Sequence, residues 1–181
     1  MKRDFLTLSN LLSIFRILLA IPFAALMLSS IPSANIWGCV VLGVGALTDK
    51  LDGYVARRYH QETEWGRILD PLADKIGVAV AGLVLLSLGR LPVWFVATIL
   101  LRDLLIFGGG LVVRARTGRV LPSNLVGKWA VGVISVTLFL AVLEVAPMLQ
   151  NVLMGATLIM LAVSLALYVR RFVEVFRSEA G

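Results

Sequence analysis

The chain is poor in residues that build many catalytic and metal centres: its 181 residues include one cysteine, Cys39, and one histidine, His60. A single cysteine excludes a disulfide or a cysteine-based metal cluster within one chain, and a single histidine excludes a histidine-rich zinc site. A serine–histidine–aspartate triad would have to use His60, which lies in a basic stretch with no evident partner. None of these three kinds of site is therefore expected.

Charge is also scarce. Charged residues make up 15% of the chain and hydrophobic residues 59%, with a mean hydropathy of +0.93. Such values are typical of membrane proteins, and we find neither strand alternation nor internal repeats. We predict an all-α integral membrane protein whose residues 1–181 form a single domain. Its six transmembrane helices would lie near residues 5–29, 34–59, 66–89, 91–115, 121–144 and 147–172.

The basic residues indicate the topology. They gather before the first window, between the second and third, between the fourth and fifth, and at the end of the chain, whereas the other three connections contain only Arg90. The positive-inside rule then predicts that both termini are cytoplasmic. The first window is long for a signal peptide and contains Arg16, so we expect it to be retained. The net charge of +6 is explained by topology and by anionic lipid, with no nucleic acid partner.

Aspartates are few but clustered. The chain has six, and four of them belong to one pattern: Asp49-x2-Asp52-Gly53-x2-Ala56-Arg57-x8-Gly66-x3-Asp70-x3-Asp74. Carboxylates at membrane depth are costly unless something pairs them. Two divalent cations would cancel their formal charge of about −4, and hard cations such as Mg²⁺ prefer oxygen ligands. The pattern favours a two-metal site over acids that are merely solvated or paired with a nearby arginine.

Helical spacing groups these residues. On a helix Asp49, Asp52, Gly53 and Ala56 fall within about 100° of one another, so two acids and two small residues share a face. Asp70 and Asp74 stack on one face of the next helix, which we expect to start or bend near Pro71. The acids should lie about 10 Å inside the cytoplasmic boundary, where a lipid phosphate and a soluble partner could meet.

This pattern resembles the signature of the CDP-alcohol phosphatidyltransferase family at every position, including the eight-residue gap between Arg57 and Gly66. Asn10 and Arg16 are also similar to the family's amino-terminal Asn-x5-Arg element. The six-helix plan fits the family over most of the chain.

The resemblance implies an enzyme that transfers a phosphatidyl group from CDP-diacylglycerol to an alcohol and releases CMP. Two Mg²⁺ or Mn²⁺ ions would be held by Asp49, Asp52, Asp70 and Asp74. Asp74 would also be the catalytic base that takes the proton from the acceptor hydroxyl. CDP would be bound by Asp49, Gly53, Ala56, Arg57 and Gly66. The resemblance further implies a homodimer in a bacterial-type inner membrane, with its active site facing the cytoplasm.

The acceptor is less clear. Residues 56–75 are similar to those of phosphatidylglycerophosphate synthases, which use glycerol 3-phosphate, and a phosphorylated acceptor needs further cations. The candidates are Arg102, Arg114, Arg116 and Lys128. Arg102 could instead pair with Asp103, and Arg114, Arg116 and Arg119 could serve topology alone. The stretch 101–109 also looks like CMP-forming cardiolipin synthases, which use phosphatidylglycerol, and inositol-phosphate transfer is a third alternative.

Two other classes of membrane protein also place acids in the bilayer. An ion transporter would more often show broken helices or repeats at the midplane, whereas these acids gather near one face. UbiA-like prenyltransferases use aspartate-rich motifs with Mg²⁺, but their chains are longer and their two motifs lie far apart in sequence. A phosphatidyltransferase remains the favoured prediction.

Overall fold

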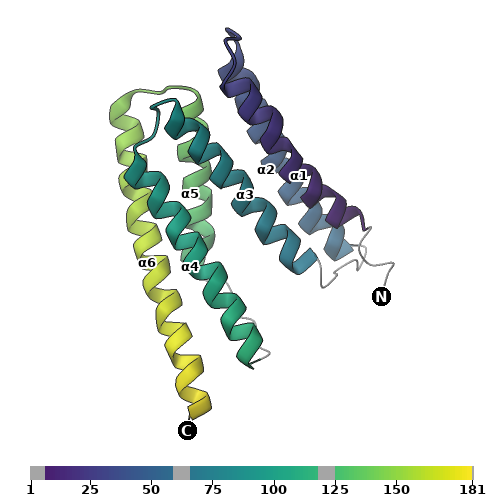
Figure 1. The fold of residues 1–181 in the computed structure, drawn as a ribbon, viewed down its shortest axis with the longest axis vertical. Helices are drawn as coiled ribbons and strands as arrows, with labels where there is room; N and C mark the ends of the chain where they lie inside the picture. The colour runs from purple at the N-terminus through teal and green to yellow at the C-terminus, as the bar shows by residue number, and fades with distance from the viewer. Residues whose placement is uncertain (1–6, 59–65, 118–124, 181) are drawn as a thin grey trace. The chain divides into compact units, whose positions relative to one another are not determined.

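The computed structural model describes residues 7–58, 66–117 and 125–180, and nearly all of them are helical. These ranges contain six helices, which agree with the six predicted windows (Figure 1). Their bounds are α1 Leu8–Met27, α2 Ala34–Arg58, α3 Gly66–Ser87, α4 Val93–Thr117, α5 Leu125–Val142 and α6 Pro147–Ala180. The predicted all-α class is thus confirmed.

Helix α1 begins at a capped end. Thr7 has extended backbone geometry, and its hydroxyl accepts a hydrogen bond from the Asn10 N–H at 3.3 Å, which satisfies one of the free amides of the first turn. The helix ends at Met27, and the Leu28 N–H still donates to the Ala24 carbonyl at 3.0 Å. This cap fixes the start of α1 at Leu8.

Helix α3 differs from our expectation at Pro71. The helix begins at Gly66, and Pro71 lies inside it rather than at its start. As the sixth residue of the helix, Pro71 lacks the N–H that would donate to the carbonyl four residues earlier, and its ring crowds that carbonyl, so the disruption falls within the first two turns. Asp70 is nevertheless helical, and Asp70 and Asp74 lie one turn apart on a continuous helix.

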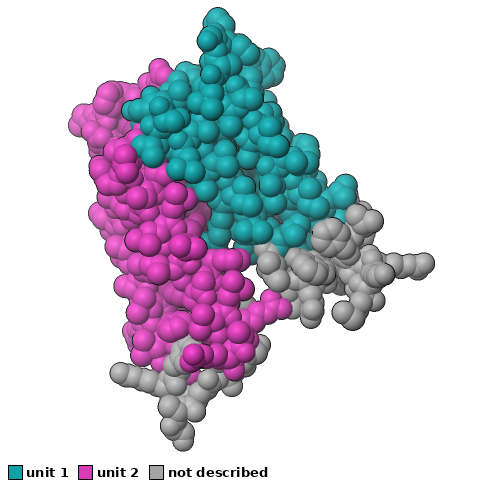
Figure 2. Space-filling model, in the orientation of Figure 1, with its two compact units in different colours: residues 1–90 teal, residues 91–181 magenta. Residues whose placement is uncertain are grey.

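The contacts divide the chain into two compact units, residues 1–90 and 91–181 (Figure 2). In the first unit α1 packs against both α2 and α3, and α2 runs antiparallel to the other two (Figure 1). In the second unit α6 packs against both α4 and α5. The buried core of the first unit includes Phe23, Met27, Ala73, Ala81 and Leu85, and that of the second Phe95, Ile134, Leu138 and Leu161.

Buried polar contacts also join helices in the second unit. The hydroxyls of Thr137 on α5 and Thr157 on α6 lie 3.2 Å apart, and the Gln150 amide donates to the Thr137 carbonyl at 3.3 Å. Tyr168 on α6 packs on the backbone of α4, where a Cβ at position 109 would lie 2.9 Å from the Tyr168 hydroxyl oxygen. Interhelical hydrogen bonds and glycine contacts of this kind are typical of helices packed in a bilayer.

Within residues 7–58, 66–117 and 125–180, three helices are long and apolar enough to cross a membrane, with spans Asn10–Met27, Val93–Arg116 and Pro147–Val175. Shorter apolar segments cover Ala34–Asp49 and Val126–Val142. Helix α3 is not among them, because its first half carries Arg67, Asp70, Asp74 and Lys75. Large apolar side chains on several helices are also exposed, among them Leu18, Trp94, Leu104, Met148 and Ile159. Six spans and two cytoplasmic termini stay predictions.

Candidate functional site

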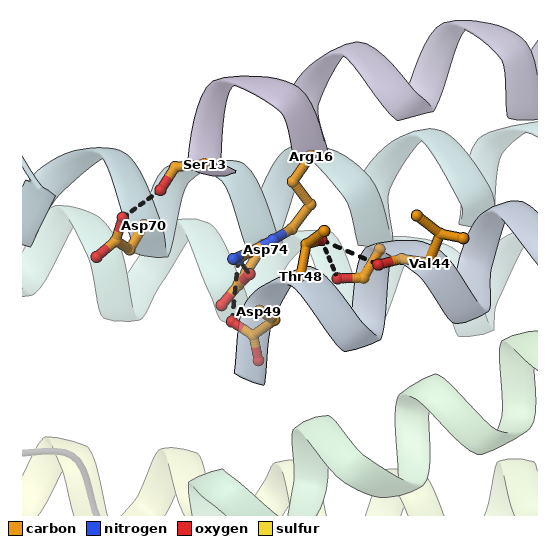
Figure 3. A network of polar contacts seen from close by, with 8 residues as sticks. Ser13, Arg16, Val44, Thr48, Asp49, Asp70 and Asp74 are labelled. Carbon is orange, nitrogen blue, oxygen red and sulfur yellow. Dashed lines mark hydrogen bonds and ion pairs between the residues drawn. The ribbon is translucent and has the colours of Figure 1, made fainter. Parts of the chain in front are cut away.

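Charged residues from all three helices of the first unit meet at one guanidinium group. The Arg16 Nη1 atom of α1 lies 3.0 Å from Asp49 Oδ1 of α2, and it also donates to Asp74 Oδ1 of α3 (Figure 3). One nitrogen thus joins carboxylates that are 25 positions apart in the chain. Hydrogen bonds between charged groups are stronger than neutral ones, so this contact links the three helices more strongly than a hydrogen bond between neutral groups would.

The two sides of this contact differ in burial. The Arg16 side chain is 7% exposed, whereas the side chains of Asp49 and Asp74 are 50% and 45% exposed. A buried guanidinium requires acidic or polar partners, because an unpaired buried charge is costly. The carboxylates keep about half of their surface open, so a cation could approach them from the side away from Arg16.

Asp70 is held by a second residue of α1. The Ser13 hydroxyl, fully buried, donates to Asp70 Oδ1 (Figure 3). Asp70 and Asp74 both face α1, as their four-residue spacing predicts. Sequence reasoning did not single out Ser13. Its signal was available: Asn10, Ser13 and Arg16 are polar residues three apart in an apolar helix, and residues three apart on a helix are neighbours.

The carboxylates of this site have the type of ligand atom that divalent cations prefer. Carboxylate oxygens are the ligands that Mg²⁺ prefers, and Asp49 and Asp74 already converge on one positive group. Within the described part of the chain, no three histidine, cysteine, aspartate or glutamate side chains lie close enough together to hold a metal ion. The Asp52 side chain lies outside the described residues, and Asp70 faces Ser13.

The predicted CDP-binding residues lie at the ends of the two acidic helices. Gly53, Ala56 and Arg57 fall in the last two turns of α2, so they and Asp49 share the helix that the spacing predicts, although the side chains after Leu51 lie outside the described residues. Gly66 is buried at the first position of α3. The binding roles of these residues stay predictions.

The predicted acceptor residues belong to the second unit. Arg102 of α4 is 8% exposed, and its guanidinium donates to Asp103 Oδ1 at 2.6 Å and to the Ser164 hydroxyl of α6 at 2.6 Å. The ion pair with Asp103 that sequence reasoning left open is therefore present. Arg114, Arg116 and Lys128 are exposed. Their part in acceptor binding stays a prediction.

Comparison with known proteins identifies the family. The model of the CDP-alcohol phosphatidyltransferase family matches residues 6–168, which cover most of both units and all four aspartates of the acidic pattern. The chain belongs to this family. It is 38% identical over 127 residues to the CDP-diacylglycerol–glycerol-3-phosphate 3-phosphatidyltransferase of Bacillus subtilis, covering 66% of this chain and 65% of that protein.

Two relatives from Mycobacterium tuberculosis carry the names of different enzymes. A putative cardiolipin synthase is 36% identical over 125 residues, which cover 69% of this chain and 59% of that protein. A probable phosphatidylglycerophosphate synthase is 32% identical over 174 residues, which cover 91% of this chain and 80% of that protein. The chain thus spans less than two thirds of the Bacillus relative and of the cardiolipin synthase, and most of the phosphatidylglycerophosphate synthase.

Proposed function

We propose that this family member transfers a phosphatidyl group from CDP-diacylglycerol to glycerol 3-phosphate, forming phosphatidylglycerophosphate and CMP. The observation that carries the proposal is the convergence of Asp49 and Asp74, from two helices, within the family's acidic pattern. Relatives from Bacillus subtilis and Mycobacterium tuberculosis whose names state this activity support the choice of reaction.

Two divalent cations, Mg²⁺ or Mn²⁺, would be held by Asp49, Asp52, Asp70 and Asp74. When bound, such ions neutralise charge on the attacked phosphate and on the departing CMP. The half-exposed carboxylates of Asp49 and Asp74 support this assignment, because ligands for a soluble ion must be reachable from solvent.

Residues near the acids would bind the cytidine diphosphate group of the substrate. Gly53, Ala56 and Gly66 would leave room for the cytidine diphosphate, because they are the smallest side chains near the acids. Arg57 would bind the diphosphate as a planar, bidentate donor. These contacts would hold the lipid-bearing phosphorus in place, and positioning alone can lower a barrier substantially.

Asp74 would act as the base. Its carboxylate would take the proton of the acceptor hydroxyl as the new oxygen–phosphorus bond forms, and the phosphorus–oxygen bond to CMP would break with its electron pair leaving on CMP. Asp74 is suited to this role because its carboxylate is half exposed and belongs to the described cluster.

A cardiolipin synthase that uses phosphatidylglycerol is the second candidate. It is favoured by the mycobacterial relative named putative cardiolipin synthase and by the stretch 101–109. Either enzyme would be an integral membrane protein with its active site on the cytoplasmic face, and we propose that it is a homodimer, as is common in the family.

An acceptor screen tests the proposal. Full-length protein in detergent is given labelled CDP-diacylglycerol and Mn²⁺, with glycerol 3-phosphate, phosphatidylglycerol, inositol 1-phosphate or serine added singly, and CMP release is measured. We expect release with glycerol 3-phosphate and its loss when EDTA replaces Mn²⁺. Release with phosphatidylglycerol alone would move the assignment to cardiolipin synthase. If no acceptor supports CMP release, with Mn²⁺ or with EDTA, the protein is not a phosphatidyltransferase. Ion transport would then become the function to test.

A further inference from the structure

The acidic cluster is assembled around α1. Helices α2 and α3 each pack against α1, and within the described residues they make no close backbone contact with each other. Asp49 of α2 and Asp74 of α3 nevertheless meet at a single atom, Arg16 Nη1. Helices α2 and α3 are thus joined through α1, and the Arg16 guanidinium is the partner that their two carboxylates share.

Electrostatics explains why a cation is needed there. Two carboxylates near one another repel, and one of them would otherwise have to give up its charge or move away. Arg16 supplies one positive charge, and its side chain is 7% exposed, so the guanidinium is closed to water while Asp49 and Asp74 stay half open. The positive side of the cluster is thus built into the protein, and its open side faces away from α1.

We propose that Arg16 is the resident cation of the acidic cluster and a positioning residue for Asp49 and Asp74. In the absence of metal, its guanidinium keeps the α2 and α3 carboxylates together. Divalent cations then bind to the same carboxylates against the positive charge of Arg16. The second part rests on the proposed function, because it takes the cluster to be the metal site.

Arg16 and divalent cations would compete for the same carboxylates, and the formal charges show why. The four aspartates carry a formal charge of about −4, Arg16 reduces it to about −3, and two divalent cations bring the total to about +1. A cluster that is overcompensated in this way holds its metals less tightly than the acids alone would. The excess positive charge is also suited to the diphosphate of a CDP-linked lipid, which would add negative charge when it binds.

Ser13 supports the same arrangement from the next turn of α1. Its buried hydroxyl donates to Asp70, whereas Arg16 donates to Asp74. Two residues of α1 that are three positions apart thus contact two acids of α3 that are four positions apart. Ser13 is neutral, so it can orient a carboxylate without competing with a metal ion. The two residues should therefore have opposite effects on metal affinity when they are substituted.

The test asks whether Arg16 acts through its charge or through packing. The variants are Arg16→Gln, Arg16→Lys, Arg16→Gln with Asp74→Asn, and Ser13→Ala, all in the full-length protein in detergent. Arg90→Gln is the matched control, because Arg90 donates to the Asn35 side chain at 3.0 Å within the same unit but at the opposite end of α2. Thermal unfolding is followed in EDTA, and Mn²⁺ binding is titrated by electron paramagnetic resonance.

In EDTA we expect Arg16→Gln to lower the melting temperature more than Arg90→Gln does. Adding Asp74→Asn should recover part of this loss, because it removes one of the two repelling charges. A residue that mattered only for packing would not be rescued by a second substitution that removes charge. An equal loss in Arg16→Gln and Arg90→Gln, or no recovery in the double variant, would overturn the proposal. If Arg16→Gln does not fold, the double variant and Arg16→Lys decide the same question.

With Mn²⁺, Arg16→Gln should bind the ion about five-fold more tightly or better. Arg16→Lys should bind like the wild type, and Ser13→Ala more weakly. If Arg16→Gln binds Mn²⁺ as tightly as the wild type or more weakly, Arg16 does not compete with the metal ions. If the wild type binds no Mn²⁺, the aspartates are not the metal site of the proposed function, and competition between Arg16 and metal ions is ruled out as well. The unfolding data in EDTA still decide whether Arg16 keeps Asp49 and Asp74 together.

Discussion

Asp74 combines two proposed roles in one side chain, since it would both hold a metal ion and accept the acceptor's proton. Its contact with Arg16 places it between α1 and the open side of the cluster. A carboxamide has nearly the same shape but can neither take a proton nor balance a cation. Substitution at this position therefore separates chemistry from packing better than substitution at the neighbouring acids.

We predict that Asp74→Asn lowers the rate of CMP release by about a thousand-fold, within the range that removal of a general base produces. The rate is measured at saturating CDP-diacylglycerol and glycerol 3-phosphate, and binding of CDP should survive. Glu174→Gln is the control, because Glu174 is an exposed carboxylate that accepts from Arg170 one turn earlier on α6. Turnover of Asp74→Asn near the wild-type rate would remove Asp74 from the mechanism.

Basic residues near the end of α4 have two interpretations, topology and acceptor binding. Arg114 is exposed in the last turn of that helix. If it binds the phosphate of the acceptor, Arg114→Gln should raise the KM for glycerol 3-phosphate about ten-fold, the loss expected for one charge-assisted hydrogen bond. The KM for CDP-diacylglycerol should not change. The control is Arg170→Gln, because Arg170 is also an exposed arginine and lies on α6; this variant should change neither constant. An unchanged acceptor KM in Arg114→Gln would leave topology as the role of Arg114.

Helices α4 and α6 approach closely where Tyr168 lies on a glycine run. At Gly109 a Cβ would lie 2.9 Å from the Tyr168 hydroxyl oxygen and 3.1 Å from its Cε1, whereas at Gly108 nothing lies within 4 Å of such a Cβ. The Tyr168 hydroxyl is buried and has no hydrogen-bond partner among the described residues. Two adjacent glycines thus differ in surroundings although they look alike in sequence.

We predict that Gly109→Ala destabilises the protein by about 1–3 kcal/mol, the usual cost of overpacking. Gly108→Ala should be neutral or stabilising by about 0.5–1 kcal/mol, because alanine is the better helix former. Thermal unfolding in detergent measures both changes. Tyr168→Phe should relieve part of the cost of Gly109→Ala, since it removes the nearest atom. Equal effects of the two alanine substitutions would mean that α4 and α6 do not approach in this way.

Topology can be read from the chain because it contains one native cysteine. Cys39 is buried, and a Cys39→Ala background would give a protein free of thiols. Ser178→Cys near the end of α6 and Ser33→Cys between α1 and α2 then report opposite sides. We predict that a membrane-impermeant maleimide labels the first only from the cytoplasmic side and the second only from the other. Labelling of both from one side would contradict the six-span plan.

Much of the architecture could be predicted from sequence. Five of the six helices begin and end within about four residues of the hydrophobic windows, and α6 runs on to Ala180, eight residues past its window. The agreement arises because the long apolar segments and the short polar connections between them are local properties. Pro71 was the exception: the sequence suggested that the helix starts or bends there, but α3 begins at Gly66 and Pro71 lies inside it. The acids could likewise be found by their spacing.

The partners of those acids could not be predicted in the same way. Ser13 and Arg16 contact residues 57 and 58 positions away, and Arg102 contacts Ser164, which is 62 positions away. Such pairs depend on how helices rotate and pack against each other, which no local pattern encodes. Sequence established a helical member of a lipid-synthesising family with clustered carboxylates, since hydropathy and residue spacing are written along the chain. Packing around α1 determined that a buried arginine joins those carboxylates, because side chains from three separate helices can meet only after the helices have assembled.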